Sequence, residues 1–173
     1  MFEVTLIVVI GLGCLSIVRW TLKIGISPMP SSTKACCAIL KVSQEAPEGT
    51  IIDLGSGWGT LIFALARQYP DRQIIGYELS WLPWVYTMIY KTMFCFKNVT
   101  IHRQDFLNTP LPEASLLVCY LFPKGMIDLQ RKLIGEPCFG SMLISSTFAL
   151  PDSRAIKTIQ LDDLYKTSIY VYQ

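Results

Sequence analysis

The stretch IIDLGSGWGT, residues 51–60, places one carboxylate and three alternating glycines directly behind an apolar run. Glycine tolerates positive φ and lets a ligand approach the backbone closely, so the pattern predicts a ligand-binding turn between a strand and a helix. The spacing GxGxG differs from the GxGxxG spacing of dinucleotide-binding turns. Asp53 would also repel a pyrophosphate, whereas it suits a ligand with positive charge. S-adenosylmethionine (SAM) fits, because it carries an α-ammonium group and a sulfonium but no phosphate.

Two further acidic residues follow the next predicted strands. Glu78 ends a strand expected at residues 73–78, and Asp105 follows a strand expected at residues 99–102. An acidic residue at the end of the second strand of nucleotide-binding α/β folds accepts hydrogen bonds from ribose hydroxyls. We therefore expect Glu78 to bind the ribose and Asp105 to accept from the adenine amino group, with Phe106 or a neighbour against the ring. Alone, Glu78 could be a surface residue and Asp105 a turn former.

The loop before the domain also belongs to the expected site. Its residues could fold over the methionine part of the cofactor, although Ser31 and Ser32 could instead cap the following helix. The full set of predicted cofactor-binding residues is Pro30, Ser31, Asp53, Gly55, Ser56, Gly57, Gly59, Glu78, Leu79, Gln104, Asp105 and Phe106.

The elements that must position these residues alternate along the chain. Strands are expected at residues 50–54, 73–78, 99–102, 115–121 and 141–146, with a closing hairpin at 156–160 and 167–172. Helices are expected at residues 33–43, 60–68, 81–96 and 124–133. This alternation predicts an α/β fold around a parallel sheet, whose ligands bind at the carboxyl ends of the strands. The helix at 81–96 is apolar nearly all round, so it either packs in the core or contacts a bilayer or a membrane substrate.

The motif DxGxGxG with the later glutamate and aspartate resembles the class I SAM-dependent methyltransferases. That resemblance covers residues 32–173 and implies a Rossmann-like, mostly parallel sheet with an antiparallel last strand. Three stretches, SPMPSSTKACCAIL, VCYLFPKGMIDLQRKL and LISSTFALPD, and the C-terminal DLYKTSIYVYQ are similar to a smaller family. It comprises membrane-anchored protein-lysine methyltransferases related to those that modify the ATP synthase c subunit and the adenine nucleotide carrier. Trp58 and Thr60 depart from that family's GSGDGR motif.

The resemblance implies an amine acceptor near the stretch that follows the fourth strand. There Tyr120 could orient the amine while Phe122 excludes water, although both could simply pack in the core. The Asn/Asp-Pro-Pro-aromatic motif of base and glutamine methylation is absent, which argues against DNA or glutamine as acceptor. Two alternatives remain: a methyltransferase for a lipid or small amphiphile, and a non-catalytic SAM-binding module.

The first residues of the chain predict a membrane segment. Residues 4–18 are uncharged and would span about 22 Å as a helix, and residues 2–22 would span about 31 Å, close to a hydrocarbon core. We expect a membrane helix at 1–24, a linker at 25–31 and the domain at 32–173; the alternative is a buried or interfacial helix. Residues 1–41 hold four basic residues and one acidic residue, which places the domain on the cytoplasmic side, or the matrix side of a mitochondrial membrane.

Composition limits the remaining function classes. Apolar residues make up 51% of the 173 residues, mean hydropathy is +0.41, and the net charge is only +2, so a nucleic-acid partner is not expected. The six cysteines form no CxxC pair, and the lone His102 has no metal-ligand spacing to them, so no metal is expected. The cysteines are expected to be reduced.

Overall fold

A computed structural model describes residues 32–135 and 142–173. Its elements are α2 (Thr33–Val42), a 3-10 turn η1 (Ser43–Glu45), β1 (Ile51–Leu54), α3 (Thr60–Gln68), β2 (Ile74–Tyr77), α4 (Trp81–Met93), β3 (Val99–His102), β4 (Leu116–Cys119), α5 (Pro123–Gly135), β5 (Met142–Ser146), β6 (Lys157–Gln160) and β7 (Ser168–Tyr172). The membrane helix expected at 1–24 and the linker at 25–31 lie outside the described residues. Within the described ranges, no helix combines the length and the apolar character needed to cross a bilayer.

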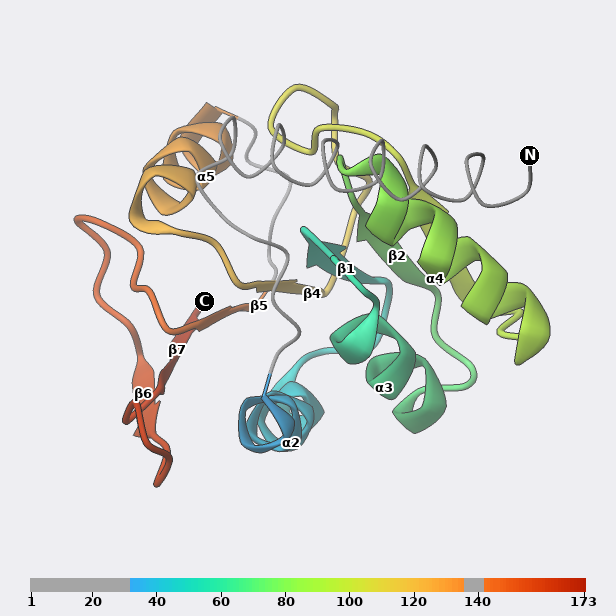
Figure 1. Ribbon diagram of the computed structural model, residues 1–173. Coiled ribbons are helices and arrows are strands. Elements are labelled where there is room, and N and C mark those ends of the chain that lie inside the picture. Colours follow the sequence, from blue (N-terminus) through green and yellow to red (C-terminus); the bar gives the residue numbers. More distant parts are fainter. Residues whose placement is uncertain (1–31, 136–141) are drawn as a thin grey trace, which may run out of the picture.

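The strands form one seven-stranded sheet in the order β3-β2-β1-β4-β5-β7-β6 (Figure 1). β1 to β5 pair in parallel, β7 pairs antiparallel with β5, and β6 pairs antiparallel with β7. Of the described strands, β7 alone therefore runs against the others. This arrangement confirms the predicted Rossmann-like sheet and closing hairpin, and it brings the carboxyl ends of β1 to β5 to one edge.

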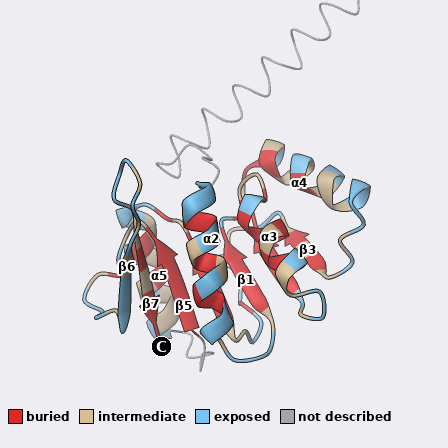
Figure 2. Cartoon of the chain, turned by 90° about the horizontal axis from the view of Figure 1, so that it is seen from below, coloured by how far each residue is buried: buried red, intermediate tan, exposed pale blue. Residues whose placement is uncertain are grey.

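Helices cover both faces of this sheet. Side chains of α2 and α3 pack on one face together with half-buried residues of α4, and side chains of α5 pack on the other. Neighbouring strand residues alternate between the two cores: Ile51 and Ile74 face the α2–α3 side, whereas Ile52 and Ile75 face α5. Burial on both faces explains why these short strands read as unbroken apolar runs in the sequence. Figure 2 shows the buried strands between the helices.

The helix after β2 ends three residues before its predicted end at residue 96. Cys95 adopts a left-handed conformation with φ 52°. Its N–H donates to the Thr92 carbonyl at 3.3 Å, and the Phe96 N–H donates to the Lys91 carbonyl at 3.1 Å. This pair of bonds is the Schellman ending, which usually uses glycine at the left-handed position. Because a cysteine occupies that position here, the helix ends without the usual stop signal in the sequence.

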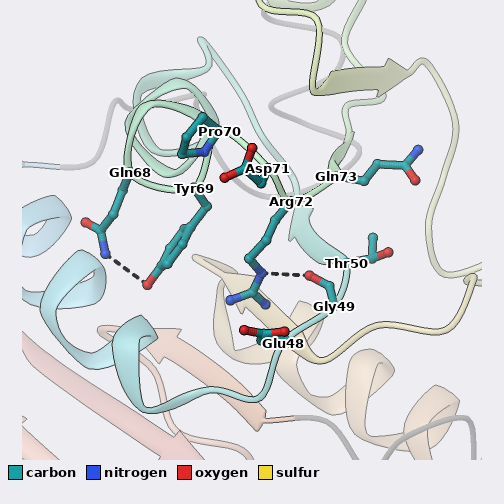
Figure 3. A pocket seen from close by; sticks show the side chains of 9 residues that line it. All are labelled: Glu48, Gly49, Thr50, Gln68, Tyr69, Pro70, Asp71, Arg72 and Gln73. Carbon is teal, nitrogen blue, oxygen red and sulfur yellow. Dashed lines mark hydrogen bonds between the residues drawn. The ribbon is translucent and has the colours of Figure 1, made fainter.

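Arg72, in the loop before β2, joins three segments at the amino edge of the sheet, and Figure 3 shows its bond to Gly49. Its Nε donates to the Gly49 carbonyl at 2.7 Å, and its Nη2 donates to the Pro47 carbonyl at 3.0 Å and to Ser115 Oγ at 2.6 Å. The guanidinium also lies over the Tyr69 ring, 4.9 Å from its centroid. Gly49, Tyr69 and Arg72 border a surface pocket. The guanidinium of Arg72 is already engaged there, because it holds together the starts of β1, β2 and β4.

We expect Arg72→Ala to lower the free energy of unfolding by about 1.5–3 kcal/mol, because hydrogen bonds from a charged donor are lost. Chemical denaturation measures this change. Arg131→Ala is the matched control, since Arg131 is exposed and pairs only with Asp128 one helical turn away in the described contacts, and it should change stability by less than about 0.5 kcal/mol. Equal effects of the two substitutions would contradict the role assigned to Arg72.

Candidate functional site

The glycine turn between β1 and α3 is fastened to the end of β2. The Gly55 and Ser56 N–H groups both donate to the Tyr77 carbonyl, at 3.0 and 2.9 Å. Gly55, Gly57 and Gly59 have φ values of 84°, 52° and 81°. At Gly59, which precedes the first turn of α3, a Cβ would lie 2.5 Å from the Phe63 ring. The turn therefore needs glycine here both for its backbone conformation and for the close approach of the helix.

Glu78 braces this turn from the neighbouring strand end. One carboxylate oxygen accepts from the Gly57 N–H at 2.8 Å, and the other accepts from the Ser80 N–H at 2.6 Å. The side chain is buried. Glu78 thus links the glycine turn to the start of α4, a role that the sequence did not reveal. Its expected contact with a ribose stays a prediction.

Asp53 lies at the carboxyl end of β1 with its carboxylate enclosed. The residue is 4% exposed, and its Oδ2 has no hydrogen-bond partner among the described residues. Burial, followed by the nearby charge of Glu78, raises the pKa of Asp53 to about 7. The buried hydroxyl of Ser56 is likewise unpartnered within the described ranges. Buried polar atoms without partners are rare in proteins, so this pair indicates a site for hydrogen-bond donors or a cation supplied by a ligand.

The atoms of Asp53 and Ser56 that are unpartnered in the described part of the chain suit SAM as a ligand. Its cationic groups and hydroxyls are the partners that an unpaired carboxylate and hydroxyl require, and the turn contains no side chain larger than serine before Trp58. Asp53, Ser56 and the glycine turn are thus brought together as predicted. Leu79 and Gln104 follow β2 and β3 at the same edge. Pro30 and Ser31 lie outside the described residues; the neighbouring Ser32 caps α2, accepting from the Ala35 N–H at 3.2 Å.

Asp105 stabilises its own turn beyond β3. Its Oδ1 accepts from the Leu107 N–H at 3.0 Å, and its Oδ2 accepts from Asn108 Nδ2 at 2.8 Å. This is the turn-forming role that the sequence left open beside adenine binding. Phe106 is half-buried and packs against the core under α5. Contacts of Asp105 and Phe106 with an adenine stay predictions.

Tyr120 and Phe122 share an aromatic neighbour that was not predicted. The Phe148 ring lies 6.5 Å from the Tyr120 ring and 5.4 Å from the Phe122 ring, with interplanar angles of 13° and 29°. Tyr120 is half-buried and Phe122 is exposed. The three rings therefore form a surface cluster beyond β4 and β5. Aromatic residues after two adjacent parallel strands were the signal that could have identified Phe148.

A strained turn holds Phe148 in this cluster. The Phe148 N–H donates to the Ser146 carbonyl at 2.9 Å, which closes a γ-turn around Thr147 with φ 73°. Ser145 Oγ donates to the Phe148 carbonyl at 2.6 Å and fixes the outgoing chain. Such turns are rare and strained, and strain of this kind concentrates at functional sites.

The described residues contain no group of three or more His, Cys, Asp or Glu side chains that could hold a metal ion. Four cysteines lie in the described part of the chain, namely Cys36, Cys37, Cys95 and Cys119, and all are free. Burial raises the pKa of Cys119 to about 12, so this thiol is inert at neutral pH.

The raised pKa of Asp53 predicts proton-linked ligand binding. In the free protein the carboxyl group holds its proton below about pH 7, and a cationic ligand must expel that proton. The affinity for SAM, relative to that of Asp53→Asn, should therefore fall about tenfold from pH 8 to pH 6. Isothermal titration calorimetry across this range measures it. Titration of the ligand's own amino group changes both affinities alike, so it drops out of their ratio. A ratio of affinities that does not change with pH would show that Asp53 does not face a cation.

The comparisons with known proteins agree with this geometry. The family model described as the ANTKMT methyltransferase domain matches residues 53–157, more than half of the chain. The chain is 28% identical over 142 residues to the adenine nucleotide translocase lysine N-methyltransferase of Mus musculus, covering 82% of this chain and 61% of the relative. It is 27% identical over 130 residues to the lysine N-methyltransferase of Xenopus laevis that is named for the ATP synthase c subunit, covering 72% and 54%.

A similar fold occurs in an RNA methyltransferase from Salinibacter ruber, solved in complex with S-adenosyl-L-homocysteine. The TM-score is 0.73 at 20% identity, covering 83% of this chain and 92% of that one. This likeness shows the shared fold. Together with the family match over more than half of the sequence, it shows that the chain belongs to the ANTKMT methyltransferase domain family of SAM-dependent methyltransferases.

Proposed function

We propose that this protein uses SAM to methylate the side-chain amine of a lysine in a membrane protein. The observation that carries the proposal is the enclosed Asp53 carboxylate, unpartnered among the described residues, behind a glycine turn. A buried acceptor of this kind favours a cationic ligand, and the family to which the chain belongs uses SAM. When bound, SAM supplies a methyl group already activated by the positive sulfur.

The protein's own residues have to present the acceptor. The lysine amine must be neutral, because an ammonium group has no lone pair with which to form the new C–N bond. Contact with the aromatic cluster of Tyr120, Phe122 and Phe148 removes water from the amine and so favours its neutral form, since desolvation lowers the pKa of an amine. As the C–N bond forms, the C–S bond breaks, and the positive charge passes from the sulfur to the methylated nitrogen. The one proton that the reaction releases is the proton that the lysine ammonium gave up before the attack. Positioning of the two reactants supplies much of the rate in such a displacement.

Lysine and a membrane setting are supported by relatives and by the first residues of the chain. The curated relatives are named for lysine methylation of the adenine nucleotide translocase and of the ATP synthase c subunit, and the chain spans 61% and 54% of their lengths. The uncharged run at residues 4–18 supports a membrane anchor at 1–24. The basic residues that follow it support a catalytic domain on the cytoplasmic or matrix side.

Phe148→Ala should lower kcat/KM for the acceptor by roughly fivefold, because a stacked ring contributes about 1 kcal/mol beyond its buried area. The affinity for SAM should change less than twofold, because Phe148 follows β5 whereas the glycine turn follows β1. Steady-state kinetics with a lysine-bearing membrane extract and calorimetry with SAM separate the two effects. Ile156→Ala, an exposed position in the same link to β6, should alter neither. Loss of SAM affinity in Phe148→Ala would place the cluster in the cofactor site instead.

The acceptor class is tested by incubating the protein with membrane extracts and SAM labelled on its methyl group. Label should run with protein, and mass spectrometry should locate it on a lysine. Asp53→Asn should abolish most of the incorporation. Label that extracts into organic solvent would identify a lipid or amphiphile acceptor, and SAM binding without any product would identify a non-catalytic binding module. Either result would overturn the proposal.

A further inference from the structure

Helix α4 turns an apolar stripe away from the core. Trp81, Tyr86, Ile89 and Met93 are 50%, 46%, 56% and 70% exposed. At 100° per residue they share one side of the helix, while Pro83 and Thr87 occupy the buried side. Figure 2 shows α4 at the outside of the molecule with exposed turns. We name the four exposed residues the outer stripe.

Helix α4 is apolar on its outer side as well as on the inner side, where Trp84 and Met88 pack against the core. A helix that packs on a sheet normally buries its apolar side and exposes its polar side. Here the one fully buried polar residue of α4, Thr87, faces inward and donates to the Trp84 carbonyl at 2.8 Å. Exposed apolar patches of this kind mark surfaces that contact a membrane or another molecule.

The charges beside the outer stripe have one sign. Residues 79–104 contain no Asp or Glu, and they contain Lys91, Lys97 and Arg103. On one flank the Arg103 guanidinium lies over the Trp84 ring, 5.9 Å from its centroid. On the other flank Arg67 of α3 donates to the Tyr90 hydroxyl at 2.9 Å. An apolar stripe between basic flanks is the pattern of helices that lie in the headgroup region of an anionic bilayer.

We propose that the outer stripe of α4 rests on the surface of an anionic lipid bilayer. The tryptophan at the start of the helix suits the level of the headgroups. Lys97 and Arg103 contact the acidic headgroups, and Ile89 and Met93 enter the acyl boundary. This surface is separate from the residues 1–24 that are proposed as an anchor, and it depends neither on the acceptor nor on catalysis.

Aromatic contacts join the outer stripe to the glycine turn. The Trp58 ring in the glycine turn meets the Tyr86 ring edge-on, with 5.4 Å between centroids. The ring centroids of Tyr86 and Tyr90 are 6.2 Å apart, and those of Tyr90 and Phe94 are 4.4 Å apart, so aromatic rings continue along α4. The helix itself begins at Trp81, three residues after Glu78. A protein held by this helix therefore has the glycine turn near the membrane surface, where a lysine close to the headgroups is within reach.

Photo-crosslinking of the full chain identifies what covers the stripe. The variant Ile89→p-benzoylphenylalanine is mixed with phosphatidylcholine vesicles with or without phosphatidylserine, irradiated and analysed by mass spectrometry. Lipid adducts should form, at least fivefold more than in the matched variant Leu164→p-benzoylphenylalanine, whose side chain is also exposed but lies between β6 and β7. Because each headgroup-facing cation strengthens binding to an anionic surface, adding Lys97→Gln and Arg103→Gln should lower the adduct yield on phosphatidylserine vesicles at least threefold.

Three results would overturn the proposal. Adducts with residues 1–31 of the same chain would show that the chain's own N-terminal part covers the stripe. Adducts between two chains would show a self-association surface. The third result is a yield of lipid adducts at position 89 no higher than at position 164, or one that changes neither with phosphatidylserine nor with loss of the two cations. Either outcome would show that α4 does not dock on an anionic bilayer.

Discussion

A carboxylate enclosed at the end of an inner strand, β1, is the constraint on which this site depends. Asp53 lies on β1, between β2 and β4, and the backbone around it cannot satisfy both of its oxygens. Burying such a group without a partner costs free energy, and the protein reduces the cost by keeping the carboxyl group protonated near neutral pH. A cationic ligand removes the same cost by supplying the missing partner. The free energy that the buried carboxyl group costs the free protein therefore contributes to the affinity for the ligand.

The rest of the carboxyl edge is arranged around that residue. Glu78 holds the Gly57 N–H with one oxygen and the start of α4 with the other, so the turn and the helix keep a fixed relation. Through Trp58 and Tyr86 the same turn meets the exposed side of α4. Phe148, beyond β5, joins Tyr120 and Phe122 in a separate aromatic cluster. One edge of the sheet thus carries the carboxylate, an aromatic surface and the beginning of an apolar helix.

Much of this fold was predictable because strands buried on both faces leave an unmistakable sequence pattern. Ile51, Ile52, Ile74 and Ile75 are apolar without alternation, and helix-length segments separate the strands, which indicates parallel pairing. The end of α4 was not predictable, because the left-handed position that stops it is filled by Cys95 rather than glycine.

Parts of the site depend on contacts that no local pattern encodes. The two bonds of Glu78 require the spatial meeting of the glycine turn, β2 and α4. Phe148 depends on a turn with positive φ at Thr147, a residue type that seldom adopts it. The position of Asp105 after β3 was predicted, but its hydrogen bonds within the turn were not. An aspartate after a strand suits a turn and a ligand equally well.

Measuring the ionisation state of Asp53 is the most direct test of whether this carboxylate binds a cationic ligand. The carboxyl-carbon chemical shift of this residue can be followed against pH by NMR in protein labelled at aspartate, with Asp53→Asn assigning the signal. Without ligand the midpoint should lie near pH 7, and saturation with SAM should move it well below that value, because the cationic ligand stabilises the carboxylate. A midpoint near the ordinary value of aspartate in the free protein, or one that SAM leaves unchanged, would contradict this role of Asp53.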